Sequence, residues 1–415
     1  MRFIMILLVL LSFTFAQHQQ LQVLIDQALK NNPALKARGH QSKAARALVE
    51  SSGALPDPTV GFGLMNLPVN SFALDQEPMT GKQITFNQAV PFPGKLGLKE
   101  TIARLQADKT LDMQKETELE IIYQVKTLYF KIFDLDRAIE VTEKNQIVLK
   151  NFIQIAQTRY TVGRGLQQDV LKAQVEYARF FDQLISLKEK REALTTQLNA
   201  VLNQPPNQNL AKTFIWEFKP LTVELDTLQF WLLKENPILL AWQKSIAQSN
   251  VKIHLAKKNF LPDFNVTVAY TQRDVLQSGM GGIDYFSAMI GLKIPLYFWK
   301  KQKNELQASR FQKEQTSQQL IDVKNQLLSA LQDAYQRANK KAELIELYKS
   351  TIIPQGSQAL NSAIAGYQND KVDFLTLLNN LMVLFKYERL FYSLISEYYQ
   401  QLAKIEYLSG KQIIK

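Results

Sequence analysis

Cysteine is absent from this chain of 415 residues, and histidine occurs only 3 times. Without cysteine, the protein has no disulfides, no thiol nucleophile and no lipid attached to an N-terminal cysteine. The histidines, His18, His40 and His254, lack the spacing of a metal-ligand or catalytic set. No phosphate-binding loop, nucleophile motif or carboxylate constellation stands out either. We therefore expect no enzymatic activity, no cofactor and no metal site.

Long apolar runs are also scarce. One short run covers residues 3–11, after Arg2, and the small residue Ala16 then precedes Gln17. This pattern indicates a secretory signal peptide over residues 1–16. A membrane anchor is the alternative, but the run is short for a span. No other run is long enough for a transmembrane helix, so we expect none in the mature chain.

Positive charges exceed negative ones, with 49 Lys and Arg against 38 Asp and Glu. The charges are interspersed, as in residues 188–192, which read Lys-Glu-Lys-Arg-Glu. Such mixing is typical of solvated helix faces. Nucleic-acid binding requires a basic patch within a recognisable module, and none is found. We therefore expect no nucleic-acid partner.

The sequence is internally duplicated. Asn-Pro occurs at 32–33 and 236–237, and Tyr160 and Tyr367, 207 positions apart, each precede turn-forming residues. Each half predicts two helices, two strands, and two long heptad-patterned helices joined by a tip. The expected segments are helices over 17–54, a β-hairpin over 55–95, a long helical hairpin over 96–202, a linker over 203–222, helices over 223–260, a β-hairpin over 261–299, a long helical hairpin over 300–408 and a tail over 409–415.

The four strand-like runs alternate apolar with polar or small residues, as strands with two unlike faces do. Their length suits an outer-membrane span when the strands are tilted. Four strands cannot close a barrel alone, and an open edge in lipid leaves backbone groups unpaired. Strands in lipid would therefore require other chains, with the apolar face toward lipid. A soluble four-stranded sheet is the alternative on the strand pattern alone.

The long helices carry two apolar stripes, which suits contact with a neighbour on each side, as in a tube of helices. Pro354 is the one interior breaker in the helix expected from residue 300 to 365, and it should kink or offset that helix. In the linker, Phe214, Trp216 and Phe218 alternate. That alternation fits either a small edge strand or a packed loop.

The chain resembles the TolC-like outer-membrane efflux family, and most closely its heavy-metal resistance–nodulation–division branch. The likeness lies in the duplicated hairpins and in four stretches: Leu-Pro-Asp-Pro at 55–58, Val-Pro-Phe-Pro-Gly-Lys at 90–95, Ile353-Pro354-Gln355, and Tyr367 before the second tip. The resemblance implies a mostly α fold with a transmembrane β-barrel. Three duplicated protomers would form a trimeric 12-stranded β-barrel in the outer membrane of a Gram-negative bacterium. A long α-helical barrel would continue it through the periplasm, with the linker in an equatorial belt.

The function implied by the resemblance is the exit duct of a tripartite efflux pump. The homotrimer would be a passive conduit for substrates such as heavy-metal cations. Its partners would be a periplasmic adaptor (membrane fusion) protein, an inner-membrane resistance–nodulation–division pump and outer-membrane lipid. A soluble periplasmic coiled-coil or adaptor-type structural protein is the alternative.

The resemblance also implies a gate at the hairpin tips. Tyr367 and Asp169 match a Tyr–Asp contact that closes it, although each could be an ordinary helix-end residue. Thr376 and Asn379 stand where the family's best-known member has acidic residues, and Val372 where its lock has an arginine. The expected gate residues are Asp169, Tyr367, Thr376, Asn379, Asp370 and Asp373. The expected adaptor-contacting residues are Val162, Gly163, Arg164, Gly165, Leu166, Asn369, Lys371 and Val372.

Overall fold

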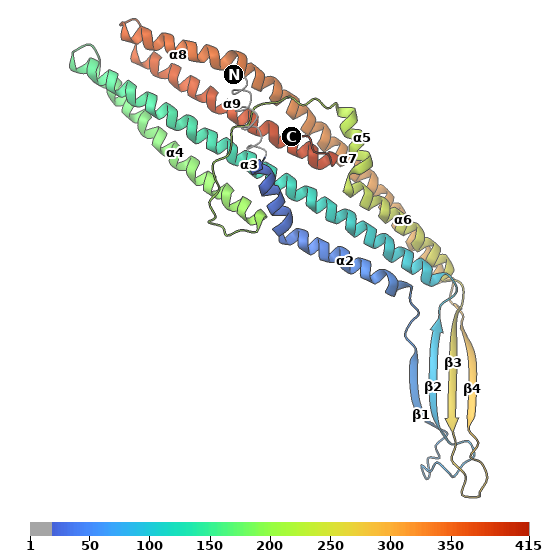
Figure 1. The fold of residues 1–415 in the computed structure, drawn as a ribbon. Coiled ribbons are helices and arrows are strands. Elements are labelled where there is room, and N and C mark those ends of the chain that lie inside the picture. Colours follow the sequence, from blue (N-terminus) through green and yellow to red (C-terminus); the bar gives the residue numbers. More distant parts are fainter. Residues whose placement is uncertain (1–18, 415) are drawn as a thin grey trace, which may run out of the picture. The chain divides into compact units, whose positions relative to one another are not determined.

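The computed structural model describes residues 19–414, and Figure 1 shows the fold. The expected signal peptide lies outside the described residues. The chain divides into two compact units. The sheet unit comprises Gly39–Met113 and Ile238–Asp322, and the hairpin unit comprises the chain up to Arg38, Gln114–Pro237 and the chain from Val323. Over the described residues, no helix combines the length and the apolar character that a membrane span requires.

The sheet unit contains four antiparallel strands in the order β1-β2-β3-β4. The strands are β1 (Thr59–Met65), β2 (Gly81–Val90), β3 (Asp263–Gln272) and β4 (Tyr285–Lys293). They follow the alternating runs of the sequence closely. Helix α2 (Pro33–Gly53) precedes β1, and α6 (Pro237–Lys258) precedes β3. Strands β1 and β4 are the two edges of this open sheet.

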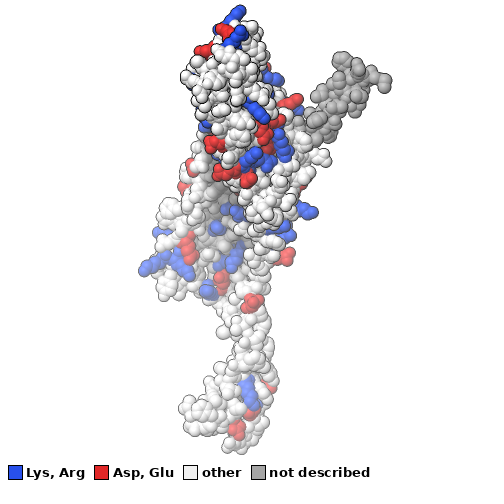
Figure 2. All heavy atoms as spheres, turned by 90° about the vertical axis from the view of Figure 1, so that its left-hand side faces the viewer, with Lys and Arg blue, Asp and Glu red and all other residues white. Residues whose placement is uncertain are grey.

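The pairing register separates the sheet into an apolar and a polar face. One row from β1 to β4 joins Phe62, Ile84, Tyr270 and Phe286. The adjacent row, on the other face, joins Gly61, Thr85, Ala269 and Ser287. The apolar side chains are uncovered, with Phe62 80% and Phe286 72% exposed. Figure 2 shows few charged side chains over the strands. The apolar face therefore lies open on the single chain.

The hairpin unit contains two long helical hairpins, visible in Figure 1. The first joins α3 (Lys95–Thr161) to α4 (Gln167–Leu202), and the second joins α8 (Ile353–Gln368) to α9 (Phe374–Ser409). Helices α3 and α7 (Gln302–Leu347) begin in the sheet unit and continue into the hairpin unit, which also contains the short α5 (Leu225–Glu235) and a helical segment at 19–31. Phe152, Phe180, Leu381 and Phe385 belong to the core between the hairpins. The heptad patterns of the sequence therefore bury one stripe between neighbouring helices.

The offset expected at Pro354 is present. Helix α7 ends at Leu347, and a π-helical turn, Tyr348–Ile352, separates it from α8. Pro354 then lies in the first turn of α8. The helix is continuous here, since Ile353 N–H donates to the Tyr348 carbonyl across the π-helical turn. The turn shifts the hydrogen-bond pattern at the place where Pro354, which has no N–H, interrupts it. The extra residue in the π-helical turn changes the register of the helix after it.

Both repeats use an asparagine side chain to bond to the end of a long helix. The amide nitrogen of Asn32 donates to the carbonyl of Val201 near the end of α4, at 2.9 Å. The amide of Asn236 donates to Leu408 near the end of α9, also at 2.9 Å. Each asparagine directly precedes a proline that begins a helix. The Asn-Pro pairs of the sequence therefore tie each short helix to the end of a long one.

The linker 203–222 is a packed loop rather than an edge strand. Its Trp216 is buried, and its ring lies 5.1 Å from that of Phe130 and 5.2 Å from that of Tyr399. Asp136 accepts hydrogen bonds from the backbone and hydroxyl of Thr213, both at 2.8 Å. These contacts hold the linker against α3 and α9. The alternating aromatic residues reflect this packing and not a strand.

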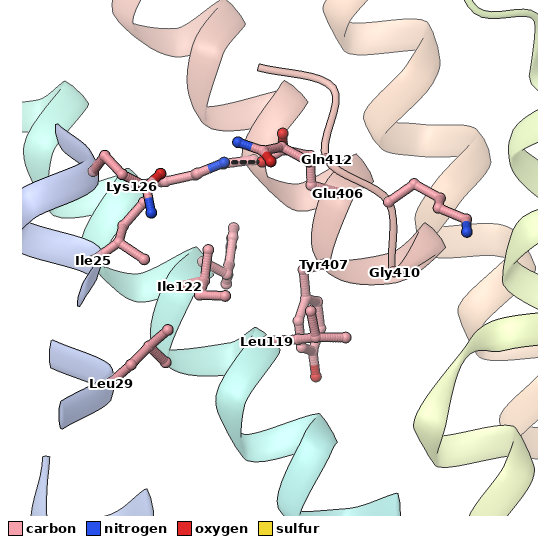
Figure 3. A pocket seen from close by; sticks show the side chains of 13 residues that line it. Ile25, Leu29, Leu119, Ile122, Lys126, Glu406, Tyr407, Gly410 and Gln412 are labelled. Carbon is pink, nitrogen blue, oxygen red and sulfur yellow. Dashed lines mark hydrogen bonds and ion pairs between the residues drawn. The ribbon is translucent and has the colours of Figure 1, made fainter. Parts of the chain in front are cut away.

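A pocket of about 210 Å³ lies between the segment 19–31, α3 and the end of α9, as Figure 3 shows. Its apolar wall includes Ile25, Leu29, Leu119 and Ile122. At its polar side, Lys126 and Glu406 form a buried ion pair. Glu406 also accepts hydrogen bonds from the backbone N–H groups of Ile413 and Ile414, at 2.6 Å each. The carboxylate therefore holds the C-terminal tail against the hairpin unit.

Candidate gate at the hairpin tips

The two tips have the same backbone geometry at positions 207 residues apart. In the first, Gly163 has φ +71° and Arg164 N–H donates to the Arg159 carbonyl at 2.8 Å. In the second, Asp370 has φ +59° and Lys371 N–H donates to the Gly366 carbonyl at 2.8 Å. This is the left-handed closure common at helix C-termini. The duplication therefore extends to individual hydrogen bonds.

The tips differ in where a glycine makes room for a neighbouring side chain. A Cβ on Gly165 would lie 3.1 Å from the Cβ of Arg159, and a Cβ on Gly366 would lie 2.6 Å from Cγ2 of Val372. Gly165 corresponds to Val372 in the repeat, and Arg159 corresponds to Gly366. Each tip thus pairs one large side chain with one glycine, in the opposite order. Val372, expected at the adaptor surface, also packs within its own tip.

Arg159 joins the two tips within one chain. Its guanidinium lies over the ring of Tyr367, 4.6 Å from the centroid. It also donates to the Tyr367 carbonyl and forms an ion pair with Asp370. The Arg159 side chain is 15% exposed, whereas that of Asp370 is 61% exposed. A charge-assisted bond with one buried partner is stronger than a surface pair, so this contact is a strong link between the hairpins.

Tyr367 is a buried aromatic residue whose hydroxyl lacks a partner. It is 5% exposed, and its ring packs edge-on against Phe374 at 5.7 Å. Among the described residues, nothing hydrogen-bonds to the hydroxyl. Burial raises the pKa of Tyr367, nearby Asp169 raises it further and Arg159 opposes both. Asp169 is near, but no hydrogen bond joins the two within this chain.

An open pocket of about 470 Å³ lies between the tips. The first hairpin contributes Arg159, Arg164, Gly165, Leu166, Gln168, Asp169 and Lys172, and the second contributes Tyr367, Asp370, Lys371, Val372, Asp373, Phe374 and Leu375. The structure therefore brings four expected gate residues together: Asp169, Tyr367, Asp370 and Asp373. Four basic residues line the same pocket: Arg159, Arg164, Lys172 and Lys371. The pocket can exchange ion pairs and hydrogen bonds with another chain.

Asp373 has a structural role as well as its expected place at the gate. Its carboxylate caps α9 by accepting a hydrogen bond from Thr376 N–H at 2.7 Å. The hydrogen bonds from Thr376 lower the pKa of Asp373, and the charge of Lys172 adds to the effect. Thr376 and Asn379 are exposed on the first turns of α9. These two positions of the expected gate therefore carry exposed, uncharged side chains.

The outermost residues of the tips present mixed chemistry. Val162 and Leu166 are 63% and 65% exposed, and Arg164 and Lys371 are also exposed. Gly163 serves the turn of the first tip. In the second, Asn369 donates its side-chain amide to Ala365 at 2.8 Å. The expected adaptor surface therefore consists of two apolar and two basic side chains around turn residues.

Sequence reasoning missed Arg159 as a site residue. It lies at the start of the first tip motif, but its partners Tyr367 and Asp370 lie more than 200 positions away, so no local pattern identifies the contact. The repeat offers only a weak signal, because the matching position in the second tip is Gly366. Within residues 19–414, no three His, Cys, Asp or Glu side chains converge as metal ligands.

The fold defines a class of protein. The fold, a duplicated chain with two long helical hairpins and a four-stranded sheet, is similar to that of solved outer-membrane proteins. VceC of Vibrio cholerae is 17% identical and covers 95% of this chain and 97% of its own, with a TM-score of 0.80. The outer-membrane channel OprN is 15% identical, and the match covers 97% of this chain and 92% of OprN with a TM-score of 0.81. CusC is 16% identical, and the match covers 95% of this chain and 92% of CusC with a TM-score of 0.78. The expected fold is therefore confirmed.

The sequence assigns the family directly. Residues 24–204 and 231–410 match the outer membrane efflux protein family, one match in each repeat. The chain belongs to this family and is therefore an outer-membrane efflux protein. The cobalt-zinc-cadmium resistance protein CzcC of Cupriavidus metallidurans is 21% identical over 346 residues, which is 77% of this chain and 75% of CzcC. The predicted family and localisation are confirmed. OprN, one of the similar structures, is an outer-membrane channel.

Proposed function

We propose that this chain forms a homotrimeric exit duct of a tripartite efflux pump. The observation that carries the proposal is the open sheet: β1 and β4 are unpaired at their outer edges, and the apolar face is exposed. In an outer membrane, such edges leave backbone groups unsatisfied at several kcal/mol each. Pairing β4 of one copy with β1 of the next removes every edge. Three copies then give a 12-stranded barrel.

In this assembly, each segment has one role. Residues 55–95 and 261–299 form the barrel, and 96–202 and 300–408 form the helical tunnel. Residues 203–222 belong to a belt around the tunnel. The polar face of the sheet, with Thr85, Thr267 and Asn87, lines water. The wall needs no covalent chemistry to act as a passive conduit.

Fractionation and electrophoresis test this assembly against a soluble periplasmic adaptor-type protein. The proposal predicts that the chain is recovered with outer membranes and migrates as a trimer in SDS without heating, then as a monomer after heating. The exposed apolar row with Phe62 and Phe286 disfavours the soluble form. Recovery of a soluble monomer from the periplasm contradicts the exit-duct proposal.

In this proposal, the duct is closed by contacts made at the pocket between the tips. A buried hydroxyl without a partner costs about 1–3 kcal/mol, so Tyr367 gains from an acceptor supplied from outside its chain. Asp169 of a neighbouring protomer is that acceptor in the proposed closed state. The partly exposed position of Asp169 in the wall of the tip pocket supports this role. Asp370 and Asp373 line the same pocket. We place Thr376 and Asn379, exposed on the first turns of α9, at the same constriction in the trimer.

The outer ends of the tips receive the periplasmic adaptor, which connects the duct to an inner-membrane resistance–nodulation–division pump. Exposed Val162 and Leu166 supply apolar contacts, and Arg164 and Lys371 supply charge. Placing Asp at both Val162 and Leu166 should reduce recovery of the cognate adaptor with the trimer by about tenfold. Arg179→Gln, away from the tips, is the control. Equal recovery contradicts this surface assignment.

Heavy-metal cations are the proposed cargo, supported by the likeness to the cobalt-zinc-cadmium resistance protein. Cells lacking this chain should accumulate more cobalt, zinc or cadmium, and the wild-type gene should reverse the increase. Metal content measured by mass spectrometry gives the result directly. Unchanged metal content together with increased retention of organic drugs contradicts the metal assignment and leaves the duct intact.

A further inference from the structure

A cluster of exposed aromatic residues follows β4 in the sheet unit. Tyr297, Phe298 and Trp299 are 71%, 50% and 57% exposed. The ring of Trp299 contacts the other two edge-on, with centroids 6.1 Å from Tyr297 and 5.2 Å from Phe298. A tight turn holds them, since Lys300 and Lys301 both donate backbone hydrogen bonds to the Tyr297 carbonyl. The rings pack on one another while remaining open to the surroundings.

The cluster continues the apolar face of the sheet. Ile290 and Leu292 lie on β4 and are 73% and 55% exposed. Ile294 and Leu296 extend the apolar stretch beyond the strand and are 58% and 65% exposed. The aromatic rings come directly after them. Aromatic rings at the end of an apolar strand face occupy the headgroup level of a membrane in transmembrane barrels.

Three lysines accompany the aromatic rings. Lys300, Lys301 and Lys303 are exposed and make no ion pair among the described residues. Lysine side chains near an anionic lipid surface add about a fivefold preference each. Their long alkyl stems can follow the aromatic surface while the ammonium groups reach phosphate. The segment thus presents both positive charges for lipid phosphates and apolar rings for the adjoining acyl chains.

The matching segment of the first repeat has the opposite character. After β2, Phe92 packs against Phe264 at 6.4 Å, and Lys95 is buried and pairs with Asp263 at 2.8 Å. The ammonium of Lys258 lies 5.6 Å from the Phe92 ring. These groups already satisfy one another within the chain. The second junction instead leaves its three aromatic rings exposed and Lys300, Lys301 and Lys303 without an ion pair among the described residues.

We propose that residues 297–303 form an interfacial anchor that binds anionic phospholipid headgroups at the end of the apolar sheet face. This inference rests on the outer-membrane location and is independent of the gate at the tips.

Tryptophan quenching tests the position of the anchor. The full chain is placed in bilayers that contain phospholipid brominated at acyl carbons 6 and 7, and fluorescence is compared between wild type and Trp299→Phe. The difference isolates Trp299 from the other tryptophans, and Trp242→Phe is the matched control. The expected result is strong quenching by brominated lipid and weak quenching by aqueous iodide. Quenching by iodide alone, or by neither agent, overturns the proposal, the latter because protein then covers the ring.

Co-purified lipid tests the charge of the partner. A variant with Gln at Lys300, Lys301 and Lys303 should retain several-fold less phosphatidylglycerol, relative to phosphatidylethanolamine, than wild type. The control carries Gln at Lys150, Lys188 and Lys190, which are exposed on the long helices. An unchanged lipid ratio in the first variant overturns the anionic headgroup assignment. Because trimer assembly is measured in the same samples, failure of the exit-duct proposal is seen separately.

Discussion

The guanidinium of Arg159 lies 4.6 Å from the centre of the Tyr367 ring and joins the first helical hairpin to the second. The same group pairs with Asp370 in the turn that follows Tyr367. One partly buried cation therefore links two tips that lie more than 200 residues apart in the sequence. Any opening of the tips that separates the hairpins of one chain must break this contact.

Replacing Arg159 with Gln should loosen the tips. The substitution removes the ion pair and the ring contact, and hydrogen bonds to charged groups contribute about 1.5–3 kcal/mol. Trypsin should then cut the exposed bonds after Arg164 and Lys371 about tenfold faster, measured by mass spectrometry of the fragments. Arg179→Gln is the control, because the ion pair of Arg179 within residues 19–414 is with Glu176, one turn earlier on the same helix. Equal cleavage rates in the two variants would show that Arg159 does not hold the tips.

Adding a methyl group at Gly366 should destabilise the second tip. Its Cβ would lie 2.6 Å from Cγ2 of Val372, and overpacking of this kind costs about 1–3 kcal/mol. The midpoint of thermal unfolding should fall in Gly366→Ala and recover in the double variant Gly366→Ala/Val372→Ala, which removes the clashing methyl groups. Gly97→Ala is the control, since a Cβ there meets nothing within 4 Å. No recovery in the double variant would exclude the clash as the cause.

Breaking the buried ion pair of Figure 3 should be costly. Lys126→Met leaves Glu406 charged and buried, and the loss of one partner of such a pair typically costs about 3–5 kcal/mol. Adding Glu406→Gln removes that charge and keeps an oxygen for the N–H groups of Ile413 and Ile414. Chemical unfolding should therefore show a smaller loss in the double variant than in Lys126→Met. The opposite order would contradict an electrostatic role for Glu406.

Asp134 should make the stability of the hairpin unit depend on pH. Burial raises its pKa from the ordinary 3.8 to about 6; Arg389 opposes this shift and Glu397 adds to it. The folded chain then holds the proton more tightly than the unfolded chain, so this contribution to stability is full below about pH 4 and is lost as pH rises through 6. Asp134→Asn should stabilise the protein by about 1 kcal/mol at pH 7 and by little at pH 4. Equal effects at both pH values in thermal unfolding would refute this prediction.

The sequence alone predicts the elements well because their signals are local. Alternation defines the strands from Thr59 to Lys293, and heptad spacing defines α3 and α9. Asn-Pro pairs mark helix starts, and Pro354 marks the offset before α8. Each of these features depends on neighbours within about seven residues. The duplication then strengthens every assignment, since a pattern seen once in each half is unlikely to arise by chance.

The site was less predictable because its contacts are not local. Arg159 meets Tyr367 and Asp370 only after two hairpins pack together. The loop around Trp216 is held by rings from α3 and α9, which alternation within the loop cannot reveal. A partner for the Tyr367 hydroxyl lies outside one chain in the proposed trimer.

Single-channel conductance of the trimer in planar lipid bilayers tests the central claim, that the tips form the closed end of an outer-membrane duct. Tyr367→Phe combined with Asp169→Ala should raise the conductance several-fold, because it removes the donor and acceptor proposed to hold neighbouring hairpins together. The control combines Tyr160→Phe, the equivalent position in the first tip, with Asp182→Ala on the exposed surface of α4, and should conduct as wild type does. An unchanged conductance in a correctly assembled Tyr367→Phe/Asp169→Ala trimer would contradict the account.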